Sequence, residues 1–587
     1  MKKKLFALCA FLFSYSSFSQ NHTKEYSIIK QKGDSLYKAG DYINAANNFS
    51  WLLRLSGEKL TIWDWNRPAF SWALAGNKDS AFYFLDGIAN MDTIKFVDYI
   101  DLVDDRDYNS IRNEPRWKLY NEKILNIAKK TFYTSLKTSD EKIILDERKW
   151  LAVAWTYNRE YDSAFHELDL LAGSRNMNYA VAMETITNGY FMQIQNDKRW
   201  SEFKSKIYSN VVVAMSSELR KPGAKITNQS RREVAIAWIN INKPDSAFYQ
   251  LNLIAGSPDL TFEDVFFIIT DGEFSNVSKV SDFKPLENDP RWTLLKDKFF
   301  IGLHNRYFND KSFATTKKSA KRLMIDGGHF NLHDIEDTYA PLAGALRYSR
   351  IEAFGLKGKF DKANLANADI VIISNPNPDR QDSIALRAQR AKEPVRWSAA
   401  ATLPGYTNDE VAAIHHWVKN GGSLLLILDH APFGKVGETL AAAFGIENRN
   451  AGTYDPLNRD PAVDTTQATT LLFTRSKGLI GKHSIMNGVD RVTTYTGESL
   501  VGPPGSDALL LIPATATDLD WLPETRQFRN RSAAGRSQGV AFNYGKGRVV
   551  MLGEAAITRP NSLSRTDSDN WKLMLNILRW LAKEKMD

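Results

Sequence analysis

The sequence contains a single cysteine, Cys9, among its 587 residues. This cysteine lies in the first twenty residues, where three lysines, the apolar run Leu5–Phe13 and small polar residues have the composition of a secretory signal peptide. We therefore expect residues 1–20 to be cleaved near Ser19 or Gln20 and the mature chain to be exported, to the periplasm or cell envelope. The mature chain then has no thiol, which excludes disulfide bonds, thiolate zinc sites and a cysteine nucleophile.

Long apolar runs and blocks of one charge are also missing. No later run reaches the roughly 18 apolar residues that a transmembrane helix requires, so we expect no integral membrane segment. The formal charge of +8 includes the three signal lysines, and acidic and basic residues are interspersed, so nucleic-acid binding is not expected. Because neither a phosphate-binding GxxxxGK[ST] loop nor an HExxH motif occurs, we predict no cofactor and no metal site.

The first half of the chain contains a repeat of 83 residues. The tetrapeptide Asp-Ser-Ala-Phe occurs three times at this interval, at Asp79–Phe82, Asp162–Phe165 and Asp245–Phe248. Trp72, Trp155 and Trp238 keep the same interval, and each copy closes with an Arg-Trp pair, at Arg116-Trp117, Arg199-Trp200 and Arg291-Trp292. Apolar residues between these marks are spaced as in amphipathic helices. We interpret the aromatic positions as packing between the repeats.

Ahead of these copies, Gly33–Tyr42 followed by Ala45, Ala46 and Phe49 resembles a tetratricopeptide helix pair. The three longer copies resemble decorated relatives of that motif. The resemblance implies that residues 21–308 form an α-helical solenoid, whose concave surface would bind a partner protein or peptide.

A basic, polar segment at 309–321 is expected to link this solenoid to an α/β domain at 322–587. Short apolar runs, each of strand length, alternate there with helical patterns, which favours a doubly wound sheet. The runs are Arg322–Ile325, Ile351–Leu356, Asp369–Ser374, Leu424–Leu428, Ala508–Ile512 and Val549–Leu552. A capping box at Thr407–Glu410 predicts a helix ending near Gly421, and Gly545–Gly547 predicts a hairpin.

Polar residues follow four of these predicted strands. Ligands of an open α/β sheet lie beyond the carboxyl ends of its strands, so we expect three of these groups, Asp326/His329, Asp429/His430 and Glu554, to face one crevice. The candidate ligand-binding residues are Asp326, Gly327, Gly328, His329, Asn331 and Asn375, and the candidate catalytic residues are Asp429, His430 and Glu554. For His430 and Glu554 a purely local role, locking a turn or capping the following residues, is an equal alternative.

The motifs IDGGHFNLH, DIVIISN, GGSLLLILDHAPFG, GLIGKHSIMNG and GKGRVVMLGEAA occur in this order. They resemble a bacterial family of unassigned function in the class I glutamine amidotransferase-like superfamily, near the trehalose-utilisation type. The resemblance covers about residues 320–585 and implies a flavodoxin-like sheet. It does not imply glutaminase activity, because the turn that carries the catalytic cysteine in amidotransferases reads Asp429-His430-Ala431-Pro432 here.

Three functions remain open from the sequence. The first is an exported protein with a partner-binding helical arm and an α/β domain that binds a small polar ligand such as a carbohydrate. The second is a hydrolase of such a substrate, with His430 as base, Asp429 as its orienting group and Glu554 as acid. The third is a structural scaffold with an inactive pocket.

Overall fold

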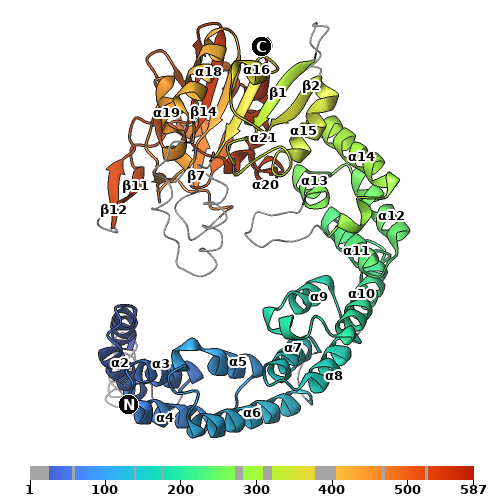
Figure 1. The fold of residues 1–587 in the computed structure, drawn as a ribbon, viewed down its shortest axis with the longest axis vertical. Coiled ribbons are helices and arrows are strands. Elements are labelled where there is room, and N and C mark those ends of the chain that lie inside the picture. Colours follow the sequence, from blue (N-terminus) through green and yellow to red (C-terminus); the bar gives the residue numbers. More distant parts are fainter. Residues whose placement is uncertain are drawn as a thin grey trace, which may run out of the picture. The chain divides into compact units, whose positions relative to one another are not determined.

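The computed structural model describes most of the 587-residue chain (Figure 1). The described residues are 26–55, 60–137, 141–174, 176–270, 282–308, 320–376, 405–431, 433–463, 470–522 and 527–586. The predicted signal peptide at 1–20 and nearly all of the predicted linker at 309–321 lie outside them.

The N-terminal half is helical, as the sequence predicts. Residues 26–38 are helical and precede α2 (Tyr42–Leu55). The further helices are α3 (Ile62–Leu74), α4 (Lys78–Ile88), α5 (Phe96–Asp104), α6 (Pro115–Ser135), α7 (Glu141–Tyr157), α8 (Tyr161–Ala172), α9 (Tyr179–Ile186), α10 (Lys198–Glu218), α11 (Asn228–Asn240), α12 (Pro244–Ala255), α13 (Phe262–Ile269) and α14 (Pro290–Tyr307).

The repeated sequence marks form one contact, which recurs in each copy. The Asp-Ser-Ala-Phe element begins α4, α8 and α12, and the Arg-Trp pair begins α6, α10 and α14. In each copy the arginine pairs with the aspartate, at 2.9, 2.7 and 2.7 Å, and its Cζ lies 4.4, 4.2 and 4.3 Å from the phenylalanine ring centroid. The tryptophans of the pairs are buried. The repeat therefore preserves a cation–π and ion-pair contact between two helices.

The chain divides into two compact units. The first runs to Ala224 and includes Asn240–Asn242, and the second comprises 225–239 and 243–587. The helices of the third copy thus belong with the α/β domain.

Aromatic packing explains why the third copy belongs to the second unit. The Trp571 ring centroid lies 5.0 Å from that of Phe262 in α13 and 4.8 Å from that of Phe308, which follows α14. In addition, the Glu263 backbone N–H donates to Ser564 Oγ at 3.0 Å. These contacts fasten the last helices of the repeat region to the α/β domain.

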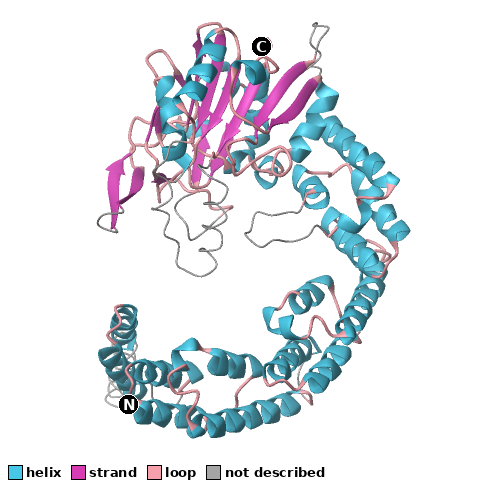
Figure 2. Ribbon diagram, in the orientation of Figure 1, coloured by secondary structure: helices cyan, strands magenta, loops and turns pink. Residues whose placement is uncertain are grey.

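The α/β domain contains a seven-stranded sheet in the order β10-β13-β14-β4-β3-β1-β2 (Figure 2). Its strands are β1 (Lys321–Asp326), β2 (Ile351–Leu356), β3 (Ile370–Ser374), β4 (Ser423–Ile427), β10 (Asp507–Ala508), β13 (Gly539–Tyr544) and β14 (Gly547–Leu552). All pairs from β14 to β2 are parallel, and β10 and β13 add antiparallel pairs. The predicted hairpin into β14 is confirmed. The predicted strand at Ala508–Ile512 is wrong beyond Ala508, because only isolated bridges continue it.

Helices cover both faces of the sheet. Leu424 and Leu426 share a core with side chains of α16 (Lys362–Leu365), α18 (Asn408–Lys419) and α19 (Phe433–Ala443). On the opposite face α21 (Asn570–Leu581) packs on β4 and β14, and Arg548 of β14 lies over the Trp580 ring. Two shorter helices, α15 (Ala340–Leu346) and α20 (Pro560–Leu563), complete the domain. The predicted capping box of α18, Thr407 with Glu410, is confirmed.

Three small antiparallel sheets, not anticipated from the sequence, lie between α19 and β13 along the chain. They pair β5 (Glu447–Asn448) with β9 (Leu500–Val501), β7 (Leu471–Thr474) with β8 (Arg491–Thr494), and β11 (Thr517–Leu522) with both β6 (Gly452–Tyr454) and β12 (Gln527–Ser532).

The repeated contact predicts how a substitution acts in the helical region. Phe165→Ala removes a buried ring that packs under Arg199, and we expect it to lower the free energy of unfolding by about 3 kcal/mol. Urea unfolding followed by tryptophan fluorescence measures the change. His166→Ala, at the exposed neighbouring position, is the matched control and should change little. Equal effects of the two substitutions would contradict the packing role of the motif.

Candidate functional site

The parallel pairing of β1, β3, β4 and β14 brings four predicted polar positions to one edge of the sheet. Ser374, the last residue of β3, is aligned with Ile427 of β4, and Leu552 of β14 is aligned with the same Ile427. Asp326, Asn375, Asp429 and Glu554 therefore all lie at the carboxyl edge of the sheet. Parallel pairing thus gives the strand ends a common edge, and the crevice expected there stays a prediction.

At the end of β1, a histidine joins two carboxyl groups. His329 Nδ1 lies 2.9 Å from Asp326 Oδ1, and His329 Nε2 lies 2.9 Å from Glu410 Oε1. The Tyr406 hydroxyl also donates to Asp326 Oδ2, at 3.3 Å. The ring of His329 stacks on Phe360 with an interplanar angle of 2°. A loop after β1 is thus fastened to the first turn of α18.

The two carboxylates favour the charged form of His329. Burial by itself lowers the pKa of this imidazole, but the hydrogen bonds and charges of Asp326 and Glu410 outweigh burial and raise it. The pKa of Glu410 is lowered: burial opposes this shift, and the hydrogen bonds from Thr407 and His329 cause it. With both ring nitrogens hydrogen-bonded to carboxylates, His329 is a buried structural cation. It has no nitrogen left to accept a proton from a substrate.

The other predicted ligand residues after β1 also build the loop. A Cβ on Gly328 would lie 2.1 Å from the Gly358 carbonyl oxygen, so only glycine fits. The Asn331 amide donates to the Asp326 carbonyl at 2.9 Å and accepts from the Ser374 N–H at 3.0 Å. Gly327 is exposed, and its N–H donates to the Leu356 carbonyl. These groups hold the ends of β1, β2 and β3 together.

Asn375, directly after β3, has one polar group that the protein does not use. Its φ is 55°, in the left-handed region that asparagine tolerates. Its Oδ1 accepts the Asp429 N–H at 3.0 Å, and its backbone carbonyl accepts the Leu332 N–H at 2.9 Å. The side chain is fully buried, yet Nδ2 has no hydrogen-bond partner among the described residues. Buried amide N–H groups of this kind usually donate a hydrogen bond, here to a water or to a ligand oxygen.

Asp429 and His430 do not form a hydrogen-bonded pair of side chains. The backbone N–H of His430 donates to Asp429 Oδ1 at 2.7 Å, and His430 Nδ1 donates to the Ala431 carbonyl at 2.7 Å. His430 Nε2 is 4.0 Å from Asp429 Oδ1, and the His430 side chain is 24% exposed. The imidazole is therefore oriented by the turn that carries it, in agreement with the local role that the sequence left open.

Glu554 has a local role and also interacts with Asp429. Its carboxylate accepts the backbone N–H groups of Tyr495 at 2.8 Å, Thr496 at 2.7 Å and Ala556 at 2.6 Å. Burial and the charge of Asp429 raise the pKa of Glu554 to about 7, against these donors. The Glu554 carboxyl group thus caps the following Ala-rich turn, as the local alternative expected, and the pKa of the same group is raised to about 7.

Three members of this edge were not recognised from the sequence as site residues: Tyr406, Glu410 and Glu498. Glu410 carried only the signal of a capping box, and Tyr406 and Glu498 carried none. Glu498 is fully buried; its carboxylate accepts from Asn448 Nδ2 at 2.9 Å and from the Asn450 N–H at 2.5 Å. Burial, with the charges of Asp429 and Asp518 adding to it, raises the pKa of Glu498 well above its usual range.

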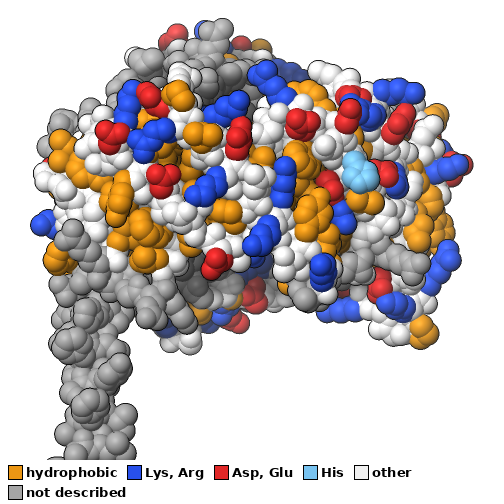
Figure 3. All heavy atoms as spheres, turned by 90° about the horizontal axis from the view of Figure 1, so that it is seen from below, with side chains coloured by type: hydrophobic (Ala, Val, Ile, Leu, Met, Phe, Trp, Pro, Cys, Tyr) orange, Lys and Arg blue, Asp and Glu red, His pale blue; other side chains and the backbone are white. Residues whose placement is uncertain are grey.

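On the face shown in Figure 3, described Lys and Arg side chains alternate with Asp and Glu, so that face has no continuous basic surface. Within the described residues, no helix is both long and apolar enough to cross a bilayer, and no cluster of three or more His, Cys, Asp or Glu side chains fits a metal ion.

The charged state of His329 predicts a pH dependence of stability. Because its pKa is raised in the folded protein, its stabilisation is fully present below the unfolded value of about 6.5 and is lost as the pH rises through the folded pKa. His329→Gln should therefore cost about 2 kcal/mol at pH 6. It should also flatten the fall in melting temperature above pH 6.5. Calorimetry measures both effects, with His416→Gln on the exposed face of α18 as control. An unchanged pH profile in His329→Gln would show that this imidazole is neutral.

Comparisons with known proteins assign no family. No protein-family model and no curated protein sequence matches the chain. A cytoplasmic protein from Salmonella typhimurium LT2 has a solved structure similar over 45% of this chain and 100% of its own, at 14% identity and a TM-score of 0.27. An exo-beta-1,4-mannosidase from Opitutaceae bacterium strain TAV5 is similar over 66% of this chain and 56% of its own, at 11% identity and a TM-score of 0.24. Similarity at this level establishes neither family nor function.

Proposed function

We propose that this chain is an exported cell-envelope protein with two binding functions. Its tetratricopeptide-like solenoid binds a partner protein or peptide. Its α/β domain binds a small polar ligand, and carbohydrates are the first candidates. In this proposal the α/β domain is a relative of the class I glutamine amidotransferase-like superfamily without glutaminase activity. The ligand lies at the carboxyl edge of the sheet, beside Asn375 and Asp429.

The strand order supports the choice of fold and of edge. The five parallel strands follow the order β2-β1-β3-β4-β14, which corresponds to the 2-1-3-4-5 order of flavodoxin-like sheets. In such sheets the ligand crevice lies where the order reverses, here between the ends of β1 and β3. Asn375 stands at the end of β3, so the unused amide lies at that reversal.

The unpartnered Nδ2 of Asn375 is the single observation that carries the ligand proposal. A donor left unsatisfied in a buried position costs roughly 1–3 kcal/mol, so a ligand oxygen that accepts from it gains affinity. The neighbouring acceptor Asp429 has one carboxylate oxygen bonded to the His430 N–H. A buried amide donor at the end of β3 and a carboxylate at the end of the adjacent β4 would together suit the vicinal hydroxyl groups of a sugar or polyol.

The repeated Asp–Arg–Phe contact supports the solenoid part of the proposal. Each copy stacks its helices through the same three side chains, and helical repeats that stack in this manner extend into arrays with a continuous surface. Because the aromatic residues of the motif are used for packing, the partner is expected to contact the polar residues between them.

A hydrolase acting on a carbohydrate is the second candidate. One observation favours it: burial and, after it, the Asp429 charge raise the pKa of Glu554 to about 7, the range of a general acid at neutral pH. The three backbone donors on Glu554 and the 4.0 Å separation of His430 from Asp429 weigh against it. We therefore rank binding before catalysis.

A ligand screen tests the proposal. Thermal shift of the mature chain with neutral monosaccharides, disaccharides and polyols should identify a stabilising ligand, and calorimetric titration then gives its Kd. Asn375→Asp keeps the acceptor for the Asp429 N–H but removes the amide donor. We expect it to weaken binding about tenfold or more.

Asn420→Asp is the matched control, because Asn420 precedes β4 at the opposite edge of the sheet and donates to the His416 carbonyl. It should bind the ligand as the unaltered chain does. The proposal fails if no member of the panel stabilises the protein, and the scaffold with an inactive pocket then becomes the better description. It also fails if Asn375→Asp binds with unchanged affinity.

A further inference from the structure

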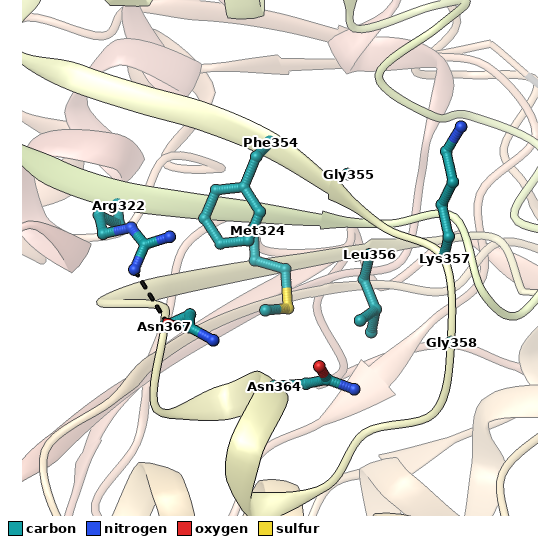
Figure 4. A pocket seen from close by; sticks show the side chains of 9 residues that line it. All are labelled: Arg322, Met324, Phe354, Gly355, Leu356, Lys357, Gly358, Asn364 and Asn367. Carbon is teal, nitrogen blue, oxygen red and sulfur yellow. Dashed lines mark hydrogen bonds between the residues drawn. The ribbon is translucent and has the colours of Figure 1, made fainter.

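We propose a second ligand site in the α/β domain, an open pocket beside β1 and β2 that binds a small organic carboxylate with an apolar body (Figure 4). The pocket has a volume of about 480 Å³ and is lined by residues of β1, β2 and the connection from β2 to β3. It is separate from Asn375 and Asp429, so the proposal is independent of the ligand proposed above.

A short connection leaves this pocket open. Strands of a parallel sheet are normally covered on both faces, usually by a full crossover helix. Here the chain runs from β2 to β3 with only α16, a single turn of helix at Lys362–Leu365. Leu365 is buried against the sheet, but Phe354 of β2 is only half-buried. The sheet face beside α16 is therefore accessible.

The floor of the pocket is apolar. Met324 of β1 is aligned with Phe354 of β2, so both side chains emerge on the same face, and Leu356 follows two residues later. Figure 4 shows the Phe354 ring, the Met324 thioether and the Leu356 side chain as one strip between Arg322 and Lys357. Met324 and Leu356 are buried, so the half-buried Phe354 ring is the part of this strip that a ring or short hydrocarbon chain can contact.

Arg322 supplies a cation at one end of the strip. Its Cζ lies 4.9 Å from the Phe354 ring centroid, and its Nη1 donates to Asn367 Oδ1 at 3.2 Å. The Phe354 ring and the Asn367 amide thus hold the Arg322 guanidinium in place. Within the described part of the chain, this guanidinium forms no ion pair. A guanidinium has five N–H donors in a planar fork that matches both oxygens of a carboxylate.

Neighbouring carboxylates form no ion pair with Arg322 among the described residues, although the Arg322 charge contributes to lowering the pKa of Asp369 after the hydrogen bonds that this carboxylate accepts, with burial opposing the shift. Asp369 accepts the Arg322 backbone N–H at 3.0 Å and pairs with the Lys321 ammonium at 2.9 Å. Glu352 is aligned with Arg322 across the β1–β2 pair but makes no ion pair with it among the described contacts. At the other end of the pocket Lys357 pairs with Glu336 at 2.8 Å. Arg322 is therefore the lining cation whose guanidinium makes no ion pair among the described contacts, and a bound carboxylate would pair with it.

An acceptor completes the site. The Asn364 amide nitrogen donates to the Lys359 carbonyl at 2.8 Å, which leaves Oδ1 directed toward the strip in Figure 4. The ligand class is defined by a carboxylate on Arg322, an apolar body on the accessible part of Phe354, and a hydroxyl or N–H near Asn364. A neutral amide of the same shape lacks the first of these interactions.

The test uses 3-phenylpropionate as probe and 3-phenylpropionamide as its neutral match, in ligand-observed NMR titrations with the mature chain. We expect a Kd on the order of millimolar for the carboxylate, as for a small fragment. The Kd should rise with added salt, and the amide should bind at least tenfold more weakly. Arg322→Gln should weaken carboxylate binding at least tenfold, and Arg322→Lys should weaken it less.

Arg347→Gln, which removes a surface cation outside the pocket, is the control and should leave the Kd unchanged. Phe354→Ala should weaken binding as well, because it removes the ring that fixes Arg322. Equal binding of carboxylate and amide, or an unaltered Kd in Arg322→Gln, would overturn the proposal. Displacement of the probe by inorganic phosphate at equal concentration would also overturn it, because the site would then select anions in general.

Discussion

The turn at Asn375 is the constraint on which the carboxyl edge of the sheet depends. The backbone leaves β3 with a φ of 55°, its N–H donates to Ile427 of β4, and its carbonyl accepts from Leu332 of the β1 loop. Its side-chain oxygen also holds the N–H of Asp429. One residue therefore fixes the ends of three neighbouring strands, and a β-branched or bulky residue could not adopt this backbone without strain. The groups that this turn aligns are those on which the functional proposal rests.

The charged groups of the edge separate into two functions. On the β1 side, Asp326, His329 and Glu410 satisfy one another, and their charges stabilise the loop and the start of α18. On the β4 side, Asp429, Glu498 and Glu554 are buried with no Lys or Arg partner among their described contacts, and burial, together with the charge of Asp429, raises the pKa of Glu498 and Glu554. Buried carboxyl groups with raised pKa values of this kind are found at functional sites more often than at structural ones.

The sequence predicted local structure better than it predicted partners across the chain. The apolar run of β4, the capping box of α18 and the hairpin into β14 follow from short patterns, and the common edge follows from parallel strands. The roles of His329 and Asn331 did not follow, because Glu410 and Ser374 lie 81 and 43 residues away from them. For the same reason, nothing near Trp571 indicated that it packs against Phe262 of the third repeat. Spacing along the chain carries no information about such contacts.

The most direct measurement is a crystal structure of residues 21–587 at a resolution that shows ordered water. Our account predicts a positive φ at Asn375 and a hydrogen bond from the Asp429 N–H to Asn375 Oδ1. It also predicts a water or ligand oxygen that lies within hydrogen-bond distance of Asn375 Nδ2 and contacts the Asp429 carboxylate. An Asn375 amide bonded to a protein oxygen, or enclosed in a dry apolar contact, would contradict it. The carboxyl edge would then be a set of structural caps without a ligand site.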